Sequence, residues 1–341
     1  MQMPPSIRAA VWRGPEQLTV EARPQPTCPP GWLLVRPERV GLCGTDFSIA
    51  SGRHGRATAP LVLGHEFVGT VATAHPAAPP PGTRVAVNPL LPCGSCWPCR
   101  NDLSHTCRNL RLIGIDLDGA LAELVAVPAT SLVPVQPSTA VSEAALTEPL
   151  AVALHAVRRA DLTDGQTALV IGAGPIGILI ALVAASVGCR VLVSEPHPVR
   201  RGLAAELGLE TLDADADPVA AVAAATGSVG SDVVFDCAGV PSVAAQLSAL
   251  ARVRGTIVLA GLYGAPAAVD LHAVTFAEQQ LVGSRVYGNV DFREALALIE
   301  AGTLGLSRLA VETFPLDAVE EAFAAARRGE TLKVLVSPDP A

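Results

Sequence analysis

Lysine is nearly absent from this chain of 341 residues, in which Lys333 is the only lysine among 24 basic residues. Alanine, glycine and proline are abundant, and we interpret the shortage of lysine as a coding bias without functional meaning. Charged residues make up 16% and aromatic residues 4% of the sequence, whereas hydrophobic residues make up 50%. This apolar share excludes an intrinsically disordered chain, and the length gives room for two domains with cores of their own.

Positive charge is also scarce. The net charge is −8, and an acidic surface repels the phosphates of nucleic acids and of anionic membranes. We therefore expect neither a nucleic acid nor a membrane as a partner.

The sequence further lacks the apolar leader of exported proteins. The opening MQMPPSIRAAVW contains no run long enough for a signal peptide, so we expect a cytoplasmic protein. One uncharged run, TALVIGAGPIGILIALVAASV at 167–187, is long enough to span a bilayer. Its centre is rich in glycine and proline, however, and this pattern is typical of a strand, a turn and a buried helix.

Half of the eight cysteines lie in one short segment, LPCGSCWPCRNDLSHTC at 91–107. Disulfides belong to oxidising compartments, and an iron–sulfur cluster also needs four cysteines. Four thiolates at such short spacings, on a loop rich in proline and glycine, are most typical of a tetrahedral structural zinc ion. A site closed by four cysteines stabilises the fold and does no chemistry. The predicted ligands are Cys93, Cys96, Cys99 and Cys107.

A second group of metal-ligating residue types is spread over three motifs. Cys43 lies in GLCGTDFSIASG, His65 and Glu66 lie in LVLGHEFVGTV, and Glu148 lies in ALTEPLAVALHAVRRA. Each motif alone is weak, because a lone cysteine is usually a small core residue.

A third pattern predicts a dinucleotide site. Gly172, Gly174 and Gly177 follow a strand-like run and open a helix in G-x-G-x-x-G spacing, which allows the backbone to approach a pyrophosphate at the helix N-terminus. The second strand, RVLVSE, ends at Glu195. A carboxylate at this place binds the ribose hydroxyls and repels a 2′-phosphate, so NAD is favoured over NADP. Pro175 and Ile176 complete the loop.

Taken together and in order, these motifs resemble the zinc-dependent medium-chain dehydrogenase/reductase superfamily, in particular its polyol and L-threonine dehydrogenase branch. The resemblance covers nearly the whole chain. It implies an α/β protein with two domains, a GroES-like β-barrel catalytic domain (about 1–149 and 289–341, with a structural-zinc lobe at 91–108) and a Rossmann domain with a doubly wound parallel sheet (150–288). It also implies an active site in the cleft between the domains, and a homo-oligomer, either a tetramer or a dimer.

The resemblance assigns roles around a catalytic zinc. It makes Cys43 and His65 ligands, and leaves Glu66 and Glu148 as two candidates for the third position. Asp46 is either a partner of the His65 ring or a turn cap. In the proton relay, Thr45 matches the family's hydroxyl residue. Ser48 stands where the family usually has histidine, so His54 or water would carry the proton.

The resemblance also extends the dinucleotide site. It places Arg200 along the adenine. Two turns should contact the nicotinamide half of the cofactor, namely Ala260–Gly261–Leu262 and Val286–Tyr287.

The implied activity is hydride transfer from a secondary alcohol of a polar hydroxylated substrate to NAD, with one catalytic and one structural Zn²⁺ per chain. Polyols, cyclitols, amino-cyclitols and diols are candidate substrates, and an L-threonine 3-dehydrogenase-type oxidation is an alternative. A non-catalytic nucleotide-binding relative should have lost Cys43, His65 or Glu148, all of which are present. A reductase of activated double bonds would lack both zinc sites.

Overall fold

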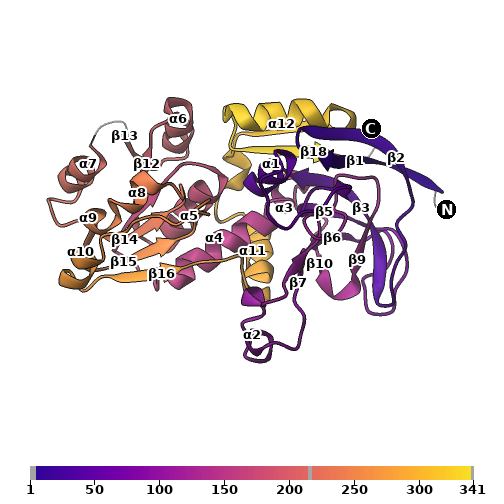
Figure 1. The fold of residues 1–341 in the computed structure, drawn as a ribbon, viewed down its shortest axis with the longest axis horizontal. Coiled ribbons are helices and arrows are strands. Elements are labelled where there is room, and N and C mark those ends of the chain that lie inside the picture. Colours follow the sequence, from indigo (N-terminus) through magenta and orange to yellow (C-terminus); the bar gives the residue numbers. More distant parts are fainter. Residues whose placement is uncertain (1–4, 214–216, 339–341) are drawn as a thin grey trace. The chain divides into compact units, whose positions relative to one another are not determined.

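The chain folds into two units, each with its own core. The structure is a computed structural model that describes residues 5–213 and 217–338 (Figure 1). The first unit contains the described residues up to Glu148, Gly288–Gly302 and those from Leu309 onward, and the second contains Pro149–Tyr287 and Thr303–Arg308. The segment 303–308 therefore packs with the second unit, although the expected boundaries put it in the first.

The first unit is built mainly from antiparallel strands. Its larger sheet has the order β10-β6-β5-β3-β18-β17, and β9 also pairs with β3. The bounds are β3 (Trp32–Gly41), β5 (Glu66–Val71), β6 (Arg84–Val87), β9 (Val125–Pro128), β10 (Leu132–Pro134), β17 (Val311–Pro315) and β18 (Lys333–Ser337). A smaller sheet has the order β2-β1-β4, from β1 (Ser6–Gly14), β2 (Gln17–Pro24) and β4 (Leu61–Val62).

Short elements complete this unit. The strands β7 (Leu90–Leu91) and β8 (Arg111–Leu112) pair at the base of a lobe that holds α2 (Trp97–Arg100) and η1 (Ser104–Thr106). The other helices are α1 (Gly44–Ala50), η2 (Ala129–Ser131), α3 (Val141–Ala144), α11 (Asn289–Ala301), η4 (Leu316–Ala318) and α12 (Val319–Arg328). The helix α4 (Thr147–Arg159) starts in the first unit and continues in the second.

Two of the three strands that pair with β3 bring distant residues together. Gly41, at the end of β3, is paired with Glu66 on β5 and with Leu335 on β18. The C-terminal strand β18, which starts at Lys333, thus lies two strands away from Glu66. This register places the last strand of the chain beside its early motifs.

The second unit contains a six-stranded sheet in which every pair of neighbours is parallel. The order is β13-β12-β11-β14-β15-β16, which is a doubly wound arrangement and confirms the predicted fold class. The strands are β11 (Thr167–Ile171), β12 (Arg190–Glu195), β13 (Glu210–Asp213), β14 (Ser231–Asp236), β15 (Ala251–Leu259) and β16 (Gln280–Gly283). The order reverses at β11, so the loop after β11 lies where such sheets bind ligands.

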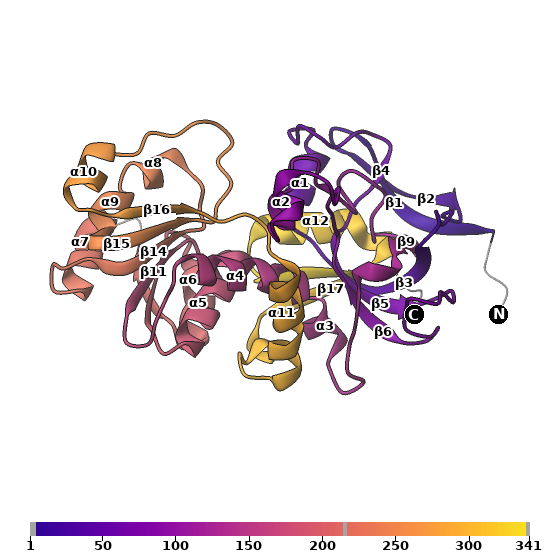
Figure 2. The same cartoon turned by 90° about the horizontal axis from the view of Figure 1, so that it is seen from below.

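Helices cover both faces of this sheet. They are α5 (Pro175–Ser186), α6 (Pro198–Glu206), α7 (Pro218–Ala225), α8 (Pro241–Ala244), α9 (Leu247–Leu250), α10 (Leu271–Phe276) and η3 (Leu306–Arg308). Figure 2 shows α5 and α6 on one side of the sheet and α9 and α10 on the other. Strands buried on both faces need continuous apolar runs, which is why β11 and β14 read TALVI and SDVVFD.

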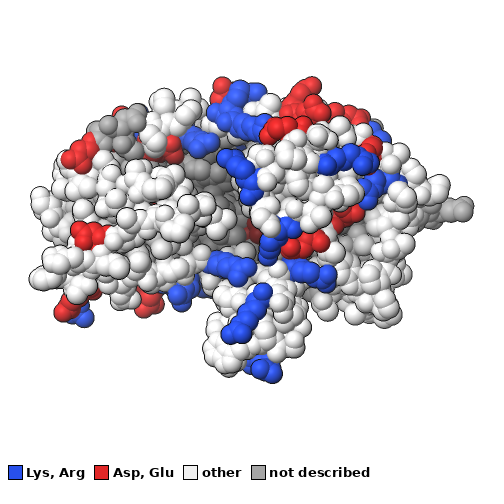
Figure 3. Space-filling view, in the orientation of Figure 1, with Lys and Arg blue, Asp and Glu red and all other residues white. Residues whose placement is uncertain are grey.

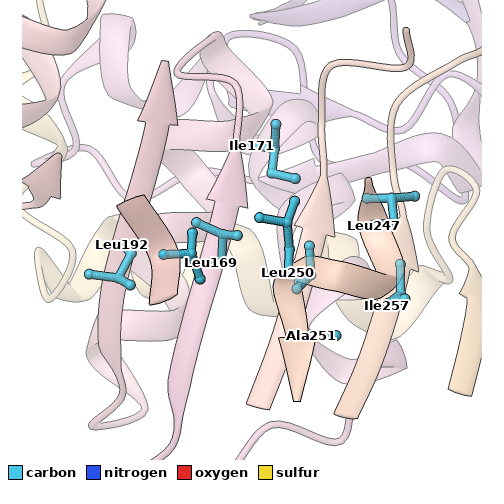
Figure 4. Packing of buried hydrophobic residues seen from close by; sticks show 9 residues of the cluster. Leu169, Ile171, Leu192, Leu247, Leu250, Ala251 and Ile257 are labelled. Carbon is cyan, nitrogen blue, oxygen red and sulfur yellow. The ribbon is translucent and has the colours of Figure 1, made fainter. Parts of the chain in front are cut away.

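A close-packed cluster fills the space between one face of the sheet and its helices (Figure 4). Leu169, Leu192 and Ile257 project from three strands, and Leu247 and Leu250 come from α9. The uncharged run 167–187 forms β11, a turn and α5, as predicted. Over the described part of the chain, no helix is long and apolar enough to cross a membrane.

Candidate functional site

The four clustered cysteines converge in the lobe between β7 and β8. Their sulfur atoms all lie within 4.8 Å of one another, and the Sγ of Cys96 is 3.5 Å from that of Cys99 and 3.7 Å from that of Cys107. A tetrahedral zinc with Zn–S bonds of about 2.3 Å separates its sulfur ligands by about 3.8 Å, so the cluster fits the ion. Hydrogen bonds from the backbone of Ser95 and Cys96 lower the pKa of Cys93 to about 5, whereas burial and the neighbouring thiols raise the pKa of Cys99 to about 12. Only part of the cluster is therefore biased toward the thiolate that a metal needs.

All eight cysteines are free thiols, so the clustered cysteines form no disulfide. The main-chain NH groups of Cys93 and Asn109 each donate to the Cys107 sulfur at 3.3 Å. Such backbone donors orient and stabilise a thiolate ligand.

A second group of ligand atoms forms beside the end of β3. The Sγ of Cys43, a ring nitrogen of His65 and a carboxylate oxygen of Glu66 all lie within 4.8 Å of one another. Cys43 is the N-cap residue of α1, His65 lies between β4 and β5, and Glu66 opens β5. A thiolate, an imidazole and a carboxylate are donors that suit zinc.

Tight backbone packing fixes the position of His65. Gly64 has a φ of +94°, and a Cβ there would lie 2.7 Å from Val40 Cγ1 and 3.1 Å from the main-chain nitrogen of Leu121. Gly114 packs against the main chain of Gly64 so closely that its own Cβ would lie 2.5 Å from the Gly64 oxygen. Only glycine fits these positions, which explains the glycine of the GHE motif.

Asp46 caps α1 and also faces the His65 ring. It is fully buried, and its Oδ2 accepts a hydrogen bond from the Cys43 NH at 2.9 Å, which caps α1. Its Oδ1 faces Nδ1 of His65 at 3.6 Å, and neither of these two atoms has a hydrogen-bond partner. Burial lowers the pKa of His65, but the nearby Asp46 and Cys43 outweigh burial and raise it well above its usual value. A metal would bind the other ring nitrogen, Nε2.

Only one of the two candidate carboxylates lies in the close ligand group. Glu66 belongs to the close group, whereas the buried Glu148, at the start of α4, does not. Both carboxylates interact with a residue to which the sequence analysis gave no role. Lys333, only 5% exposed, forms an ion pair with Glu66, donates to the Leu42 carbonyl at 2.9 Å and lies within electrostatic range of Glu148. The only lysine of the chain therefore has a specific place, which a coding bias does not explain.

The proposed relay residues are close to α1. The Thr45 hydroxyl lies 3.8 Å from the Cys43 sulfur, and Ser48 lies one turn further along the helix. Nδ1 of His54 accepts from the NH groups of Arg56, at 3.4 Å, and Ala57, at 3.2 Å. Burial and Arg56 lower the pKa of His54, so the ring is neutral with its proton on Nε2. This arrangement makes His54 a donor at Nε2 and leaves it no lone pair there.

The glycine-rich loop follows β11 as expected. Gly172 has a φ of +100°, and its NH donates to the Ser194 carbonyl on β12 at 2.8 Å. A Cβ at Gly177 would overlap the Gly172 oxygen, so the helix can pack against the strand only with glycine. Gly174 is the N-cap residue of α5 and is followed by Pro175 and Ile176. The first NH groups of α5 are free for a phosphate.

Glu195 closes this loop from the neighbouring strand. It is buried, and its two oxygens accept from the NH groups of Ala173, at 2.7 Å, and His197, at 2.8 Å. Arg200 lies half-buried on α6. Arg201 instead pairs with Asp213 at 3.1 Å and donates to the Glu195 carbonyl at 2.8 Å. The Glu195 carboxylate and the Arg201 guanidinium thus hold the ends of the strands that border the loop.

Two further turns meet at Asp236, which sequence reasoning did not single out. The NH groups of Ala260 and Gly261 donate to its main-chain oxygen at 3.0 and 2.7 Å, and its Oδ2 accepts from the Tyr263 hydroxyl. Leu262 is 88% exposed. In the second expected turn, Val286 has a φ of +41° and Tyr287 is fully buried.

One pocket of about 460 Å³ opens beside the cysteine lobe and is rich in arginine. On the face drawn in Figure 3, this lobe (labelled α2 in Figure 1) carries basic side chains and no acidic ones. The charged residues that line the pocket are Arg56, Arg108 and Arg111.

Comparisons with known proteins agree with this geometry. Residues 29–137 match the family model "Alcohol dehydrogenase GroES-like domain", and residues 175–301 match "Zinc-binding dehydrogenase". The 2-dehydro-3-deoxy-L-galactonate 5-dehydrogenase of Pseudoalteromonas atlantica is 39% identical over 84% of this chain and 85% of its own length.

Two solved structures are similar over almost the full length. A putative zinc-binding dehydrogenase from Sinorhizobium meliloti, bound to NADP, has a TM-score of 0.92 and 33% identity, and the match covers 98% of this chain and 99% of that one. The short chain alcohol dehydrogenase of Escherichia coli CFT073, complexed with NADH, has a TM-score of 0.92 and 28% identity, with 98% and 100% covered.

Proposed function

Because this chain belongs to the zinc-dependent medium-chain dehydrogenase/reductase superfamily, in its polyol and L-threonine dehydrogenase branch, we propose that it oxidises a secondary alcohol of a polar hydroxylated substrate with NAD. The convergence of Cys43, His65 and Glu66 beside the Thr45 hydroxyl carries this proposal. A ligand set of three protein groups leaves a fourth position for a substrate oxygen.

Residues of the first unit would bind the metal, orient its histidine ligand and transfer the proton. Cys43, His65 and a carboxylate would hold the zinc, which acts as a Lewis acid on the substrate oxygen when bound. Asp46, whose Oδ1 lies 3.6 Å from His65 Nδ1, would orient the ring so that Nε2 is left for the metal. The Thr45 hydroxyl, near the Cys43 sulfur, takes a hydrogen bond from the substrate hydroxyl and passes its proton on. Because His54 holds its proton on Nε2, water is the better acceptor for this proton.

The second unit supplies the cofactor site. The loop 172–177 and the N-terminus of α5 suit the pyrophosphate. We propose NAD as the cofactor because the buried Glu195 carboxylate borders the ribose position and would repel a 2′-phosphate. The two solved relatives carry NADP and NADH respectively, so kcat/KM for both cofactors must be measured for this chain.

We propose that acidic sugars belong to the substrate range. The relative from Pseudoalteromonas atlantica, which is 39% identical to this chain, is named for a sugar acid, and this likeness supports the proposal. The test is NADH production from a panel of sugar acids, polyols, amino-cyclitols and L-threonine, combined with metal analysis. The absence of turnover with every hydroxylated substrate, or of any bound zinc, would overturn the proposal.

We further propose a cytoplasmic homo-oligomer, either a dimer or a tetramer. The edge strand β16 leaves unpaired backbone groups, and exposed apolar side chains lie on it and near it, including Leu281 and Phe276. Such an edge is a template for pairing with a second copy. Light scattering on the purified protein measures the oligomeric state. The free thiols suit a reducing compartment.

A further inference from the structure

We propose that the arginine-rich pocket beside the cysteine lobe binds a small organic oxyanion, either a phosphate monoester or a carboxylate. The pocket lies in the first unit, and none of its lining residues belongs to the proposed catalytic zinc site or to the cofactor loop. The inference is therefore independent of the proposed dehydrogenase activity.

The wall of the pocket offers positive charge and no negative charge. Its charged side chains are Arg56, Arg108 and Arg111, and Asn109 adds a further polar group. Among the described residues, only Arg56 of these three has a carboxylate partner, since its Nη2 lies 3.3 Å from Oδ2 of Asp116. Arg108 and Arg111 are exposed, so two guanidinium groups keep their hydrogen-bond donors for a ligand.

The cysteine lobe holds the backbone of this site in place. The NH group of Asn109 donates to the Cys107 sulfur at 3.3 Å, and the pairing of β7 with β8 holds the backbone of Arg111. Arg56 comes from a distant loop but is tied to the same segment, because its Nη1 donates to the Leu110 carbonyl at 3.1 Å. The backbone of the site is thus formed before a ligand arrives, which lowers the entropic cost of binding.

The size and the apolar wall of the pocket indicate the class of ligand. Its volume of about 460 Å³ falls within the usual range of small-molecule sites, about 300–1,000 Å³. Planar guanidinium groups match the oxygen atoms of phosphates and carboxylates. An inorganic ion would leave most of the volume empty, whereas an organic anion can also bury its carbon skeleton. The apolar lining residues are Trp32, Leu91, Pro92 and Leu110.

The charge of the surrounding chain also favours a small anion. The whole protein carries a net charge of −8, yet on the face drawn in Figure 3 the lobe shows basic side chains and no acidic ones. Most of the surface repels an anion and this region attracts it. An extended polyanion such as a nucleic acid would also contact the negative surroundings, so the field selects a small ligand.

Compensation of the zinc–thiolate charge is the competing explanation for the arginines. Cys93 lines the pocket, and four thiolates exceed the positive charge of a zinc ion. In the described part of the chain, however, the donors to the clustered sulfur atoms are backbone NH groups, the Ser95 hydroxyl and the thiols themselves, with no guanidinium among them. The arginines therefore lie beside the cluster without binding it.

The test is calorimetric titration of the zinc-loaded, full-length protein with glycerol 3-phosphate and, separately, with gluconate, at constant ionic strength. The variants are Arg108→Gln and Arg111→Gln. Arg100→Gln is the matched control, because Arg100 lies on the lobe but does not line the pocket.

We expect the wild-type protein to bind at least one of the two probes, and the tighter one distinguishes a phosphate from a carboxylate ligand. Each pocket variant should raise the Kd by about 10-fold, because it removes hydrogen bonds to a charged group. Arg100→Gln should raise it by less than about 2-fold, because it changes only the distant charge. Release of the lobe zinc to a chromogenic chelator should be equally fast in all four proteins.

Binding of neither probe would overturn the inference. So would an equal loss of affinity in Arg100→Gln, which would reduce the effect to net charge. An affinity that none of the substitutions changes would place the ligand elsewhere, at the catalytic zinc or the loop 172–177, and would overturn it too. Faster zinc release from the two pocket variants with unchanged anion affinity would show instead that the arginines compensate the thiolates.

Discussion

The hydroxyl of Tyr263 donates a hydrogen bond to the buried carboxylate of Asp236, and this contact joins two turns at the C-terminal edge of the parallel sheet. The other carboxylate oxygen of Asp236 accepts from the NH groups of Ala238 and Gly239. The turns also touch through their backbones, since a Cβ on Gly261 would lie 2.5 Å from the Gly239 nitrogen. The wall that would face the nicotinamide is thus held as one piece.

Tyr263→Phe should loosen this wall. The substitution leaves the Asp236 carboxylate without one donor, and because the hydroxyl is partly exposed, the free energy of unfolding should fall by about 1 kcal/mol. The Kd for NADH should rise by about 5-fold, with little change for ADP-ribose, which lacks the nicotinamide. Denaturant titration and fluorescence titration measure the two effects. Equal NADH affinity in wild type and variant would show that the turns do not need this bond.

The same pair predicts a response to alkaline pH. Burial and the hydrogen bond to Asp236 raise the pKa of Tyr263 above its ordinary value of about 10. The folded state therefore keeps a proton that the unfolded chain loses, and the resulting stability is present below pH 10 and lost as the pH rises further. Unfolding at pH 9 and about pH 11 should show a larger loss in wild type than in Tyr263→Phe. Parallel losses in both proteins would exclude Tyr263 as the cause.

Glu195 should set the cofactor preference. Glu195→Gln keeps the size of the side chain but removes the charge that would bind the ribose and repel a 2′-phosphate. We expect kcat/KM for NAD to fall by about 10- to 150-fold, the cost of a hydrogen bond to a charged acceptor, and the NADP-to-NAD ratio to rise. Arg201 is already paired with Asp213, so the gain for NADP should be modest. A ratio that does not move would remove the ribose role of Glu195.

Cys43→Ser should separate the two metal sites. Loss of this ligand should remove the catalytic zinc and lower turnover by at least about 100-fold, while one zinc per chain and the melting temperature remain, because the lobe is untouched. Metal analysis and NADH production check both parts. Normal activity in this variant would contradict the assignment of Cys43.

Cys99→Ser should lower the stability of the protein and leave the ligands of the catalytic zinc in place. It opens a closed four-sulfur site whose metal-binding energy contributes to folding, so the free energy of unfolding should fall by about 2 kcal/mol or more. The melting temperature should drop by about 4 °C or more. Unchanged melting together with unchanged zinc content would contradict a structural zinc in the lobe.

Most features that could be predicted from the sequence depend on local spacing. The four cysteines, the glycine-rich loop and the division of 167–187 into strand, turn and helix all depend on residues a few positions apart. Lys333 and its acceptor Leu42 are 291 positions apart, and only the pairing of β18 with β3 brings them together. No periodicity or motif encodes such a contact.

The direction of side chains is the second kind of detail that could not be predicted from the sequence. The sequence could place His54 near the relay but not the two backbone NH groups that occupy its Nδ1. It singled out neither Asp236, at the end of β14, nor the tyrosine that binds it from the next turn. These details depend on loop conformation, which local propensity does not determine.

The burial of Lys333 has a practical consequence for work with this protein. The chain offers one side-chain amine, and folding places it at 5% exposure behind a carboxylate. Lysine-directed crosslinkers, fluorescent esters and amine-coupled surfaces should therefore find no reactive side chain on the native molecule. Once the C-terminal strand separates from the sheet, this one lysine becomes available, so its labelling, assigned by peptide mapping and thus distinguished from that of the α-amino group, can report that opening.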